Sequence, residues 1–342
     1  MMEVSSFKSK SHLFESKNQY SGLNPLQALE NIKIRCQQRK QKKKSNLKTA
    51  LVLQGGGMRG VFGAGVCCAL EELGYTEGFD QIYGVSAGAL NAAYFLSGQA
   101  AFGTTIYYQN INNRRFINLF RRKKIVDIDF LMKIVTKEKP LNIEKLLSSS
   151  TTLNVILTCV ASGKPVIFRH KDRGKDILKI LKGTAALPFL YDIPVEIDGR
   201  KFLDGGISCP IPVVETIKDG CTDIFVVLTR HEYYQPSPPR GIWENFLVKP
   251  VIKKHGENLY NLYTTSYNNY KERMLIATGK KLYGERKVNI ITIFPDPEIG
   301  ITRLTKNKDT LKKAATDGAI KTFNLFGVKN IHPAEVLKFL NY

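Results

Sequence analysis

The stretch GVSAG at residues 84–88 decides how this sequence is interpreted, because it sets a serine between two glycines. An apolar pair at 82–83 precedes it and predicts a strand, and residues 89–96 follow it and predict a helix. A serine on such a strand-to-helix turn exposes its hydroxyl as a nucleophile, and glycines relieve crowding in the strained turn. The helix N-terminus also favours negative charge beside Ser86.

A second unit of the same kind lies upstream. Residues 49–54 predict a short buried strand, the glycine-rich loop GGGMRG follows at 55–60, and residues 61–73 predict a helix that ends at Gly74. A loop between a strand and a helix aims backbone N–H groups at an anion. Two such units in sequence predict an α/β fold with a mainly parallel central sheet and helices on its faces.

The glycine loop also fits a second interpretation. The spacing of Gly55, Gly57 and Gly60 matches the fingerprint of dinucleotide-binding folds, and Asp80 stands at the distance where such folds hold a ribose. Asp80 precedes the apolar pair at 82–83, however, so it would lie at the wrong end of that strand. We therefore interpret the loop as an oxyanion hole, with a nucleotide site as the alternative.

A third motif, DGG at residues 204–206, follows a predicted strand. Residues 195–203 predict a hairpin that turns at Asp198–Gly199. A glycine pair after Asp204 allows a tight turn and the close approach of another segment. Taken alone, this motif is most often only a turn.

Together and in this order, the three motifs resemble those of the patatin-like phospholipase family. Residues 125–131 and 210–213 are similar to further positions of that family. The resemblance covers about residues 48–326 and does not extend to the N-terminal segment. It implies a three-layer α/β fold and a serine lipid acyl hydrolase, phospholipase A-like, which cleaves acyl esters of membrane lipids through a Ser–Asp dyad.

Carried onto this chain, the resemblance makes Ser86 the nucleophile and Asp204 its base. The oxyanion hole would use the backbone N–H groups of Gly56, Gly57 and Met58. Cys209 stands where relatives often have Asn or Asp, which leaves the hydrogen bonding after Asp204 open. The remaining site residues implied are Gly55, Arg59 and Gly60 in the oxyanion loop, Gly84 and Gly88 around the nucleophile, and Gly205 and Gly206 after the base.

Two further classes of function stay open beside this one. The order Ser, Asp, His of other α/β-hydrolases is possible, since His231, His255 and His332 all follow Asp204. The surroundings of these histidines predict solvated surface positions instead. The other class is a catalytically silent protein of the same fold that binds lipid or nucleic acid.

The net charge of the chain indicates which kind of partner it attracts. The chain of 342 residues has 51 Lys and Arg against 30 Asp and Glu, a net charge of +21. We predict a basic, flexible tail over residues 1–46 and a hydrolase domain over residues 47–342. Such a tail attracts anionic surfaces, and for a lipid hydrolase the expected partner is an anionic membrane. Without any nucleic-acid motif, we expect no nucleic acid as partner.

Other features bear on location and cofactors. The N-terminus has no apolar signal region, and no run approaches the ~18 apolar residues of a membrane span. The six cysteines are scattered without metal-ligand spacing. We predict a cytoplasmic protein that can lie at the periphery of a membrane, with no metal and no cofactor.

Four segments carry apolar patterns outside the motifs. Segments 114–124 and 240–250, the latter with Trp243, mix basic and bulky apolar residues and predict either interfacial segments or amphipathic helices packed on the core. Tyrosines recur over 260–274 and predict a core seam. Residues 311–323 predict one more helix, with Gly327 as its stop.

Overall fold

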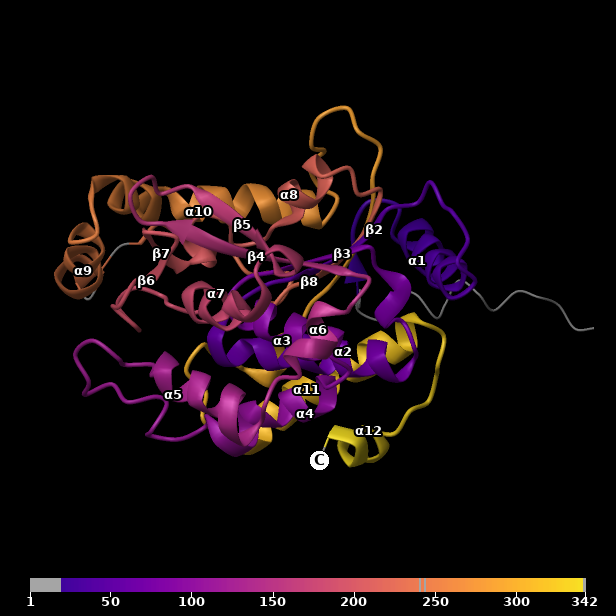
Figure 1. Ribbon diagram of the computed structural model, residues 1–342, viewed down its shortest axis with the longest axis horizontal. Helices are drawn as coiled ribbons and strands as arrows, with labels where there is room; N and C mark the ends of the chain where they lie inside the picture. The colour runs from indigo at the N-terminus through magenta and orange to yellow at the C-terminus, as the bar shows by residue number, and fades with distance from the viewer. Residues whose placement is uncertain (1–19, 240, 243, 341–342) are drawn as a thin grey trace, which may run out of the picture.

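A computed structural model of the chain describes residues 20–239, 241–242 and 244–340. These residues form one mixed sheet in the order β1-β9-β8-β2-β3-β4-β7-β6, with β5 paired to β4 (Figure 1). The strands are β1 Tyr20–Ser21, β2 Thr49–Leu53, β3 Gln81–Gly84, β4 Thr152–Cys159, β5 Pro165–Arg169, β6 Val195–Ile197, β7 Arg200–Asp204, β8 Asp223–Val227 and β9 Asn289–Ile293.

The centre of the sheet is parallel. Strands β9, β8, β2, β3 and β4 run in one direction, and Leu51 of β2 stands between Ile82 of β3 and Phe225 of β8. Strands β1, β5, β7 and β6 pair antiparallel at the margins. The predicted hairpin turn is confirmed, since Asp198 and Gly199 both have positive φ, as a two-residue hairpin turn requires. The predicted α/β class with a mainly parallel sheet is correct.

Helices cover both faces of this sheet. In Figure 1, α2, α3, α4 and α11 lie below the sheet, and α8 and α10 lie above it. The helices are α1 Pro25–Lys40, α2 Val61–Glu72, α3 Ala87–Leu96, α4 Ala100–Thr105, α5 Ile128–Lys133, α6 Ile143–Leu147, α7 Ile177–Thr184, α8 Val213–Lys218, α9 Lys249–Lys253, α10 Glu257–Ala277, α11 Lys308–Leu325 and α12 Pro333–Leu340. Short 3-10 turns are η1 Gly57–Gly60, η2 Thr76–Gly78, η5 His170–Asp172, η6 Gly174–Asp176, η7 Gly205–Ile207 and η9 Pro297–Ile299, and π turns are η3 Ile106–Asn110, η4 Ile134–Glu138 and η8 Glu244–Val248.

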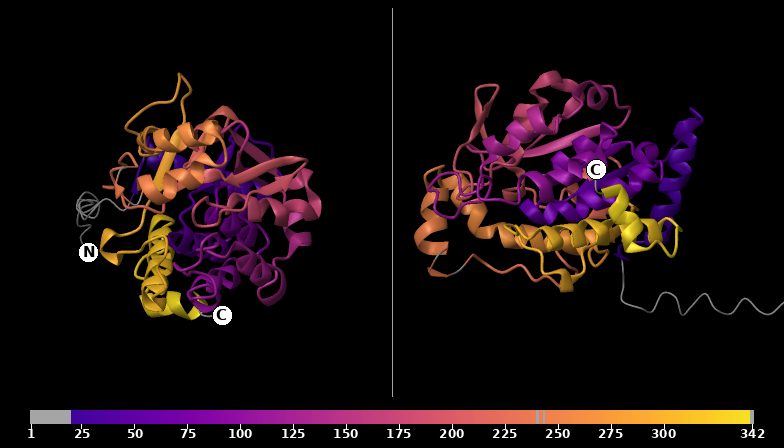
Figure 2. Two further views of the ribbon diagram at one scale, coloured as in Figure 1. Left: turned by 90° about the vertical axis from the view of Figure 1, so that its left-hand side faces the viewer. Right: turned by 90° about the horizontal axis from the view of Figure 1, so that it is seen from below.

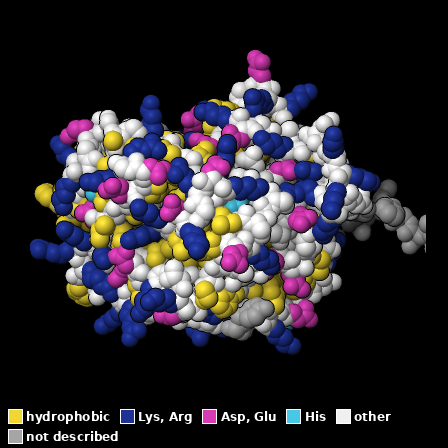
Figure 3. Space-filling model, viewed as in Figure 1, with side chains coloured by type: hydrophobic (Ala, Val, Ile, Leu, Met, Phe, Trp, Pro, Cys, Tyr) yellow, Lys and Arg dark blue, Asp and Glu magenta, His cyan; other side chains and the backbone are white. Residues whose placement is uncertain are grey.

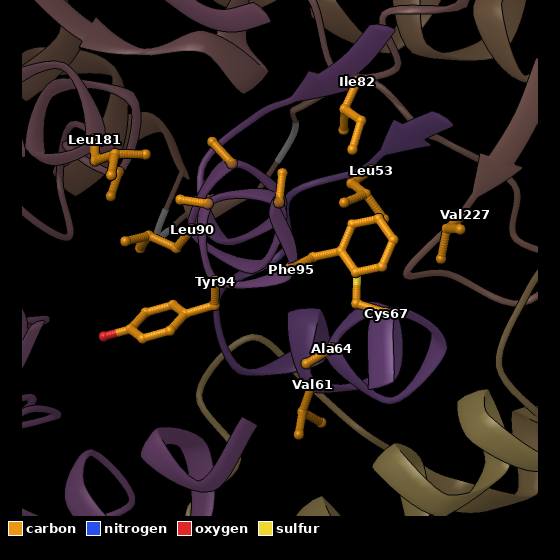
Figure 4. Packing of buried hydrophobic residues seen from close by; sticks show 14 of the residues in the cluster. Leu53, Val61, Ala64, Cys67, Ile82, Leu90, Tyr94, Phe95, Leu181 and Val227 are labelled. Atoms are coloured by element: carbon orange, nitrogen blue, oxygen red, sulfur yellow. The ribbon is translucent and has the colours of Figure 1, made fainter. Parts of the chain in front are cut away.

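The three layers follow from the alternation of side chains along each strand. Leu51 and Leu53 of β2 belong to the core on one face of the sheet. Ala50 and Val52 belong to the core on the other face, because successive residues of a strand point in opposite directions. Figure 4 shows the first core from close by, with Phe95 of α3 packed between the strands and α2.

Helix α1 corrects the expectation of a flexible tail over residues 1–46. Its residues Ala28 and Ile32 are fully buried, so burial of one apolar face holds the helix on the domain. Arg35 donates to Asp80, just before β3, and Asn31 donates to Asp223, where β8 begins. The helix therefore caps the amino ends of the parallel strands. Residues 1–19 lie outside the described part of the chain, and for them the tail stays a prediction.

The tyrosine stripe of α10 agrees with its prediction in part. Tyr263 and Tyr270 pack against the core, as expected of a core seam. Tyr263, Tyr267 and Tyr270 are only half-buried, however, and also line a cleft. The helical period placed them correctly on one face, but that face borders a hollow. By contrast, α11 buries Leu311 and Phe323 as predicted, and the chain turns at Gly327 with positive φ.

The two mixed basic and apolar segments are exposed at one end of the molecule. Segment 114–124 forms turns, not a helix, and it exposes Leu119 and Phe120 while burying Phe116 and Ile117. This arrangement excludes the packed amphipathic helix for that segment. Around the second segment, Ile242, Phe246 and Leu247 are exposed, and Trp243 lies outside the described residues.

Figures 1 and 2 place α9, which follows the second segment, at the opposite end of the molecule from α1. In Figure 3, Lys and Arg are spread over the visible face, with hydrophobic side chains exposed at the α9 end. Among the described residues, no helix combines the length and the apolar character that spanning a bilayer requires.

The packing of α2 against α11 makes a testable prediction. A Cβ at Gly65 would overlap the Ala315 carbonyl, whereas a Cβ at Gly63 would lie 3.6 Å from its nearest neighbour. We expect Gly65→Ala to lower the free energy of unfolding by about 1–3 kcal/mol through overpacking. Gly63→Ala should keep or raise it by up to about 1 kcal/mol, because alanine favours helix. Urea denaturation of both variants measures the difference, and equal midpoints would contradict the close helix contact.

Candidate active site

Ser86 occupies a strained turn between β3 and α3. Its φ is +53° and its ψ is −127°, a conformation that costs a residue with a side chain about 1–3 kcal/mol. The turn is forced because a Cβ at Gly88 would overlap the carbonyl of Leu53, so the start of α3 packs directly on the end of β2. The serine therefore stands at the carboxyl edge of the parallel sheet, at the N-terminus of α3.

Thr184, at the end of α7, holds this turn in place. Its Oγ1 accepts a hydrogen bond of 2.9 Å from the backbone N–H of Ser86 and donates one of 2.6 Å to the carbonyl of Ile156 in β4. Thr184 is fully buried. Its two bonds connect the serine turn to the neighbouring strand. The sequence analysis did not identify this residue, because no local motif marks a threonine at a helix end.

Asp204 ends β7, two strands away from β3 in the sheet. It is 4% exposed, and its Oδ1 accepts a 2.7 Å hydrogen bond from Gly206 N–H. Burial raises the pKa of Asp204 to about 6, against lowering effects of the Gly206 N–H, the Ser86 hydroxyl and the Arg303 guanidinium. A carboxylate with this pKa is a stronger base than an exposed aspartate.

The glycine motif after Asp204 has a packing reason. A Cβ at Gly205 would overlap the carbonyl of Ile156, so only glycine allows this approach to β4. The thiol of Cys209 lies within hydrogen-bond distance of Glu215 and Arg273, and its backbone N–H donates to the carbonyl of Gly205. The carboxylate of Asp204 accepts from the backbone N–H of Gly206.

The glycine-rich loop leads from β2 to α2 and borders Ser86. The N–H groups of Gly56 and Gly57 have no hydrogen-bond acceptor among the described residues, as donors of an oxyanion hole require. The Met58 N–H differs, because it donates to the carbonyl of Arg303 at 3.1 Å. In this conformation, two of the three predicted donors are free.

Side chains fix the loop in position. Asn91 of α3 donates to the carbonyl of Gly60 at 2.8 Å and accepts from Tyr107. Thr229, after β8, donates to the carbonyl of Gly55 at 2.7 Å. These bonds anchor the two ends of the loop to α3 and to β8, so its N–H groups are held in place before any ligand arrives.

Two hollows of different character meet at Ser86. An apolar pocket with an empty volume of about 760 Å³ runs between α3, η3 and α5, lined by Leu90, Ile106, Phe116 and Leu131 among others. A polar cleft of about 1420 Å³ lies between the glycine loop and α10, and its lining includes Arg59, Arg230 and Tyr270. The residues that line both are Gly57, Ser86, Leu187, Asp204 and Arg303.

The histidines of the alternative triad lie elsewhere. No histidine is among the described residues that line either hollow. His255 is mostly buried and bonds to Asp192 at 2.6 Å, so its predicted place in a solvated loop is wrong. His332 accepts a bond from the backbone of Ala334. The geometry gives the Ser, Asp, His order no support.

The nucleotide interpretation also fails on position. Asp80 accepts from Arg35 and from the backbone of Thr49, at the amino ends of β2 and β3. The glycine loop lies at the opposite, carboxyl ends of these strands. Asp80 therefore binds Arg35 of α1 and does not face a ribose site beside the loop.

The described residues contain no group of three or more His, Cys, Asp or Glu side chains that could hold a metal ion.

Comparison with known proteins agrees with the motifs. The family model for patatin-like phospholipases matches residues 51–217. The uncharacterized protein YjjU of Escherichia coli (strain K12) is 27% identical over 245 residues, which cover 68% of this chain and 66% of that protein. The human patatin-like phospholipase domain-containing protein 2 is 28% identical over 171 residues, covering 47% of this chain and 32% of that protein.

The matched regions span just under two thirds of the first relative and about a third of the second. Among solved structures, the crystal structure of VipD from Legionella pneumophila aligns with a TM-score of 0.47 at 14% identity. That alignment covers 82% of this chain and 67% of the VipD chain.

The raised pKa of Asp204 predicts how the reactivity of Ser86 depends on pH. If Asp204 is the base, its deprotonated form is required, so the rate at which a fluorophosphonate labels Ser86 should fall about tenfold for each pH unit below 6. Labelling at a series of pH values, followed by mass spectrometry, measures this rate. Circular dichroism at each pH controls for unfolding. A rate that stays level down to about pH 4 in the folded protein would exclude this role.

Proposed function

Because residues 51–217 of this chain belong to the patatin-like phospholipase family, we propose that the protein is a serine lipid acyl hydrolase that cleaves acyl esters of membrane lipids. One observation carries the proposal: Ser86 and Asp204 both line an apolar pocket and a polar cleft where these meet. An acyl ester has the same division, with an apolar chain on one side of its carbonyl and a more polar alcohol on the other.

The apolar pocket supports an acyl chain as the bound group. The pocket extends from Ser86 and Asp204 past Leu90 to Leu131. Its walls are mainly aliphatic and aromatic side chains from α3, η3 and α5. A chain seated there would present its carbonyl carbon to Ser86, and its carbonyl oxygen to the glycine loop.

In the proposed reaction, the Ser86 oxygen forms a bond to the ester carbonyl carbon while its proton passes to Asp204. The carbonyl oxygen takes up negative charge, which the N–H groups of Gly56 and Gly57 stabilise. The C–O bond to the alcohol then breaks, and the alcohol leaves with the proton from Asp204. Water attacks the acyl-enzyme, gives its proton through Asp204 to Ser86, and releases the carboxylic acid.

The hydrogen bond between Met58 and Arg303 occupies the third predicted donor of the oxyanion hole, the Met58 N–H. The carbonyl of Arg303 now accepts the Met58 N–H, so this N–H can join the oxyanion hole only if the segment before α11 moves. The two free donors, Gly56 N–H and Gly57 N–H, can already stabilise the oxyanion, since one such donor typically lowers the activation free energy by about 3–4 kcal/mol. The assignment of the six residues Gly55 to Gly60 to the oxyanion loop is therefore part of this proposal.

Substitution of the dyad tests the function. Ser86→Ala should abolish hydrolysis of a soluble acyl ester, and Asp204→Asn should lower kcat by about a thousandfold or more, because each removes a reacting group. His231→Ala and His332→Ala are the matched controls and should keep wild-type rates. Steady-state kinetics on p-nitrophenyl butyrate gives the comparison. Full activity in folded Ser86→Ala, or no activity in the wild type, would leave the silent lipid-binding protein as the better account.

The proposed site of action is an anionic membrane surface. The exposed side chains Leu119 and Phe120 stand in a segment with several arginines and lysines, next to Phe116, which lines the apolar pocket. The second exposed segment includes Glu244, which lines the polar cleft. Bulky apolar groups beside basic residues are typical of protein segments that enter a lipid interface. Both segments thus adjoin the hollows that meet at Ser86.

The basic run near the N-terminus contributes less to this surface than its sequence predicts. Arg35 is paired with Asp80, and Arg39 donates to the Phe79 carbonyl. These two side chains bind α1 to the residues just before β3. The membrane partner therefore rests on the two exposed segments and, as a prediction, on residues 1–19.

Replacement of an exposed apolar side chain tests the membrane surface. Phe120 is 97% exposed, so Phe120→Ser should leave the fold intact while it lowers binding to vesicles that contain anionic lipid. Loss of a phenyl group from a membrane interface is worth about 1–2 kcal/mol, or roughly tenfold in partitioning. Vesicle co-sedimentation measures it, with Lys137→Ser as an exposed control outside the segments. Equal binding by both variants would contradict the assignment.

A further inference from the structure

Two buried hydrogen bonds in series connect the apolar pocket to the glycine loop. The Tyr107 hydroxyl donates to Oδ1 of Asn91 at 3.0 Å, and Nδ2 of Asn91 donates to the carbonyl of Gly60 at 2.8 Å. Tyr107 and Asn91 both line the apolar pocket. Gly60 ends η1, the last turn of the glycine loop. The series therefore begins at the proposed acyl site and ends at the proposed oxyanion hole.

Asn91 occupies a position that packing alone would give to an apolar residue. It belongs to α3, every residue of which is buried, and it is itself only 7% exposed. Asparagine favours a helix less than alanine or leucine does, and burial of an amide is costly unless its atoms are hydrogen-bonded. Here the amide oxygen and the amide nitrogen each have a partner. These two bonds are what asparagine supplies and leucine could not.

The Tyr107 hydroxyl also lies where the loop meets the turn of the nucleophile. A Cβ at Gly60 would lie 2.7 Å from the Tyr107 hydroxyl oxygen and 2.6 Å from the Cβ of Ala87. Ala87 directly follows Ser86 and begins α3. The backbone of Gly60 is thus in close contact with both residues, and a shift of Tyr107 would displace the loop at this junction.

The local backbone presents Tyr107 to the pocket. Tyr107 belongs to η3, a π turn that continues α4 and is closed by the bond from the Ile111 N–H to the Ile106 carbonyl at 3.0 Å. Such turns are rare and occur frequently at functional sites. Ile106 and Tyr107 line the pocket, whereas the Tyr108 hydroxyl donates to the Leu340 carbonyl of α12.

An acyl chain in the pocket would act on this series through Tyr107. A chain that fills the pocket gives the tyrosine ring packing partners on the side that an empty pocket leaves without contacts. It also excludes water from the two hydrogen bonds, and hydrogen bonds are stronger in surroundings of low dielectric constant. Both effects would hold Gly60 more firmly, and with it the N–H groups of Gly56 and Gly57.

We propose that Tyr107 and Asn91 are positioning residues that couple the filling of the apolar pocket to the geometry of the oxyanion hole. This proposal rests on the proposed acyl hydrolase and adds a control of its rate by the acyl chain. Both residues act through the backbone of Gly60 and not on the ester itself. The enzyme then reaches its full kcat only on esters whose acyl chain fills the pocket.

Removal of the Tyr107 hydroxyl tests the coupling. Monomeric p-nitrophenyl octanoate and p-nitrophenyl acetate differ only in the acyl chain, and the wild type should have the higher kcat on the octanoate. Tyr107→Phe keeps the ring as a pocket wall, so KM for the octanoate should stay within about twofold. Its kcat on the octanoate should fall about three- to tenfold, as expected for loss of one hydrogen bond, while kcat on the acetate should change less than about twofold.

Tyr94→Phe is the matched control. Tyr94 also lines the pocket, but its hydroxyl donates to the carbonyl of Lys139, which follows η4. This variant should keep the wild-type ratio of kcat on the two esters. Asn91→Leu should lower the ratio, and Tyr107→Phe added to it should have no further effect, because both act through one series of bonds. An unchanged ratio in Tyr107→Phe, or an equal loss in Tyr94→Phe, would overturn the proposal.

Hydrogen exchange separates the coupling from hydrolysis. The probe is n-hexane, which has no polar group and can fill the apolar pocket without bonding to the glycine loop. We expect hexane to slow amide exchange over residues 55–62 in the wild type, as measured by mass spectrometry, and to leave it unchanged in Tyr107→Phe. Slower exchange over residues 106–110 in both proteins shows that hexane is bound in both.

The outcomes of the exchange experiment are distinct. Slower exchange of the loop that requires the Tyr107 hydroxyl, in a wild type that hydrolyses no ester, would support the coupling while it removes the hydrolase. Hydrolysis by a wild type whose loop does not respond to hexane would overturn the coupling alone. Equal slowing in the wild type and in Tyr107→Phe would also overturn it, since the hydroxyl would then have no part in the response.

Discussion

The strained backbone of Ser86 is the constraint on which the rest of the site depends. A residue with a side chain rarely combines a φ of +53° with a ψ of −127° unless its surroundings enforce it. Here the start of α3 packs directly on the end of β2, and Thr184 ties the turn to β4. The turn thus requires the three adjacent strands β2, β3 and β4 in their parallel register. The geometry of the site therefore depends on the pairing of these three strands.

The order of the strands in the sheet places the glycine loop and Asp204 beside Ser86. The glycine loop follows β2, the serine follows β3, and Asp204 ends β7, which pairs with β4. In the sheet only β4 separates β7 from β3, although β7 begins more than a hundred residues after β3 in the chain. Groups at the ends of neighbouring strands meet in the crevice outside the sheet. Buried in that crevice, Asp204 gains the basicity that the proposed reaction needs.

The two hollows divide polar from apolar surface on either side of the dyad. The apolar pocket is enclosed by helices whose other side chains form the main core, so its walls are an extension of that core. The polar cleft lies between loops and the tyrosine face of α10. Its lining includes Arg59, Arg230 and Arg303, which come from segments that are far apart in the chain.

The sequence by itself determined the local parts of this protein. Ser86, the glycine loop, the turn at Asp198–Gly199 and the helix over 311–323 were predicted because the residues that form each turn or helix are close together in the chain. Such patterns depend on backbone sterics and on the period of side chains, which a sequence displays directly.

Only the tertiary structure decided the rest. The packing of α1 on the strands, the bonds of Thr184 and the grouping of Arg59, Arg230 and Arg303 each join segments that are distant in sequence. The tyrosines of α10 show the same limit, since their period placed them on one face but could not tell a core from a cleft. Burial and charge pairing are properties of the folded chain, because they depend on which distant segments come together, and no local pattern encodes that.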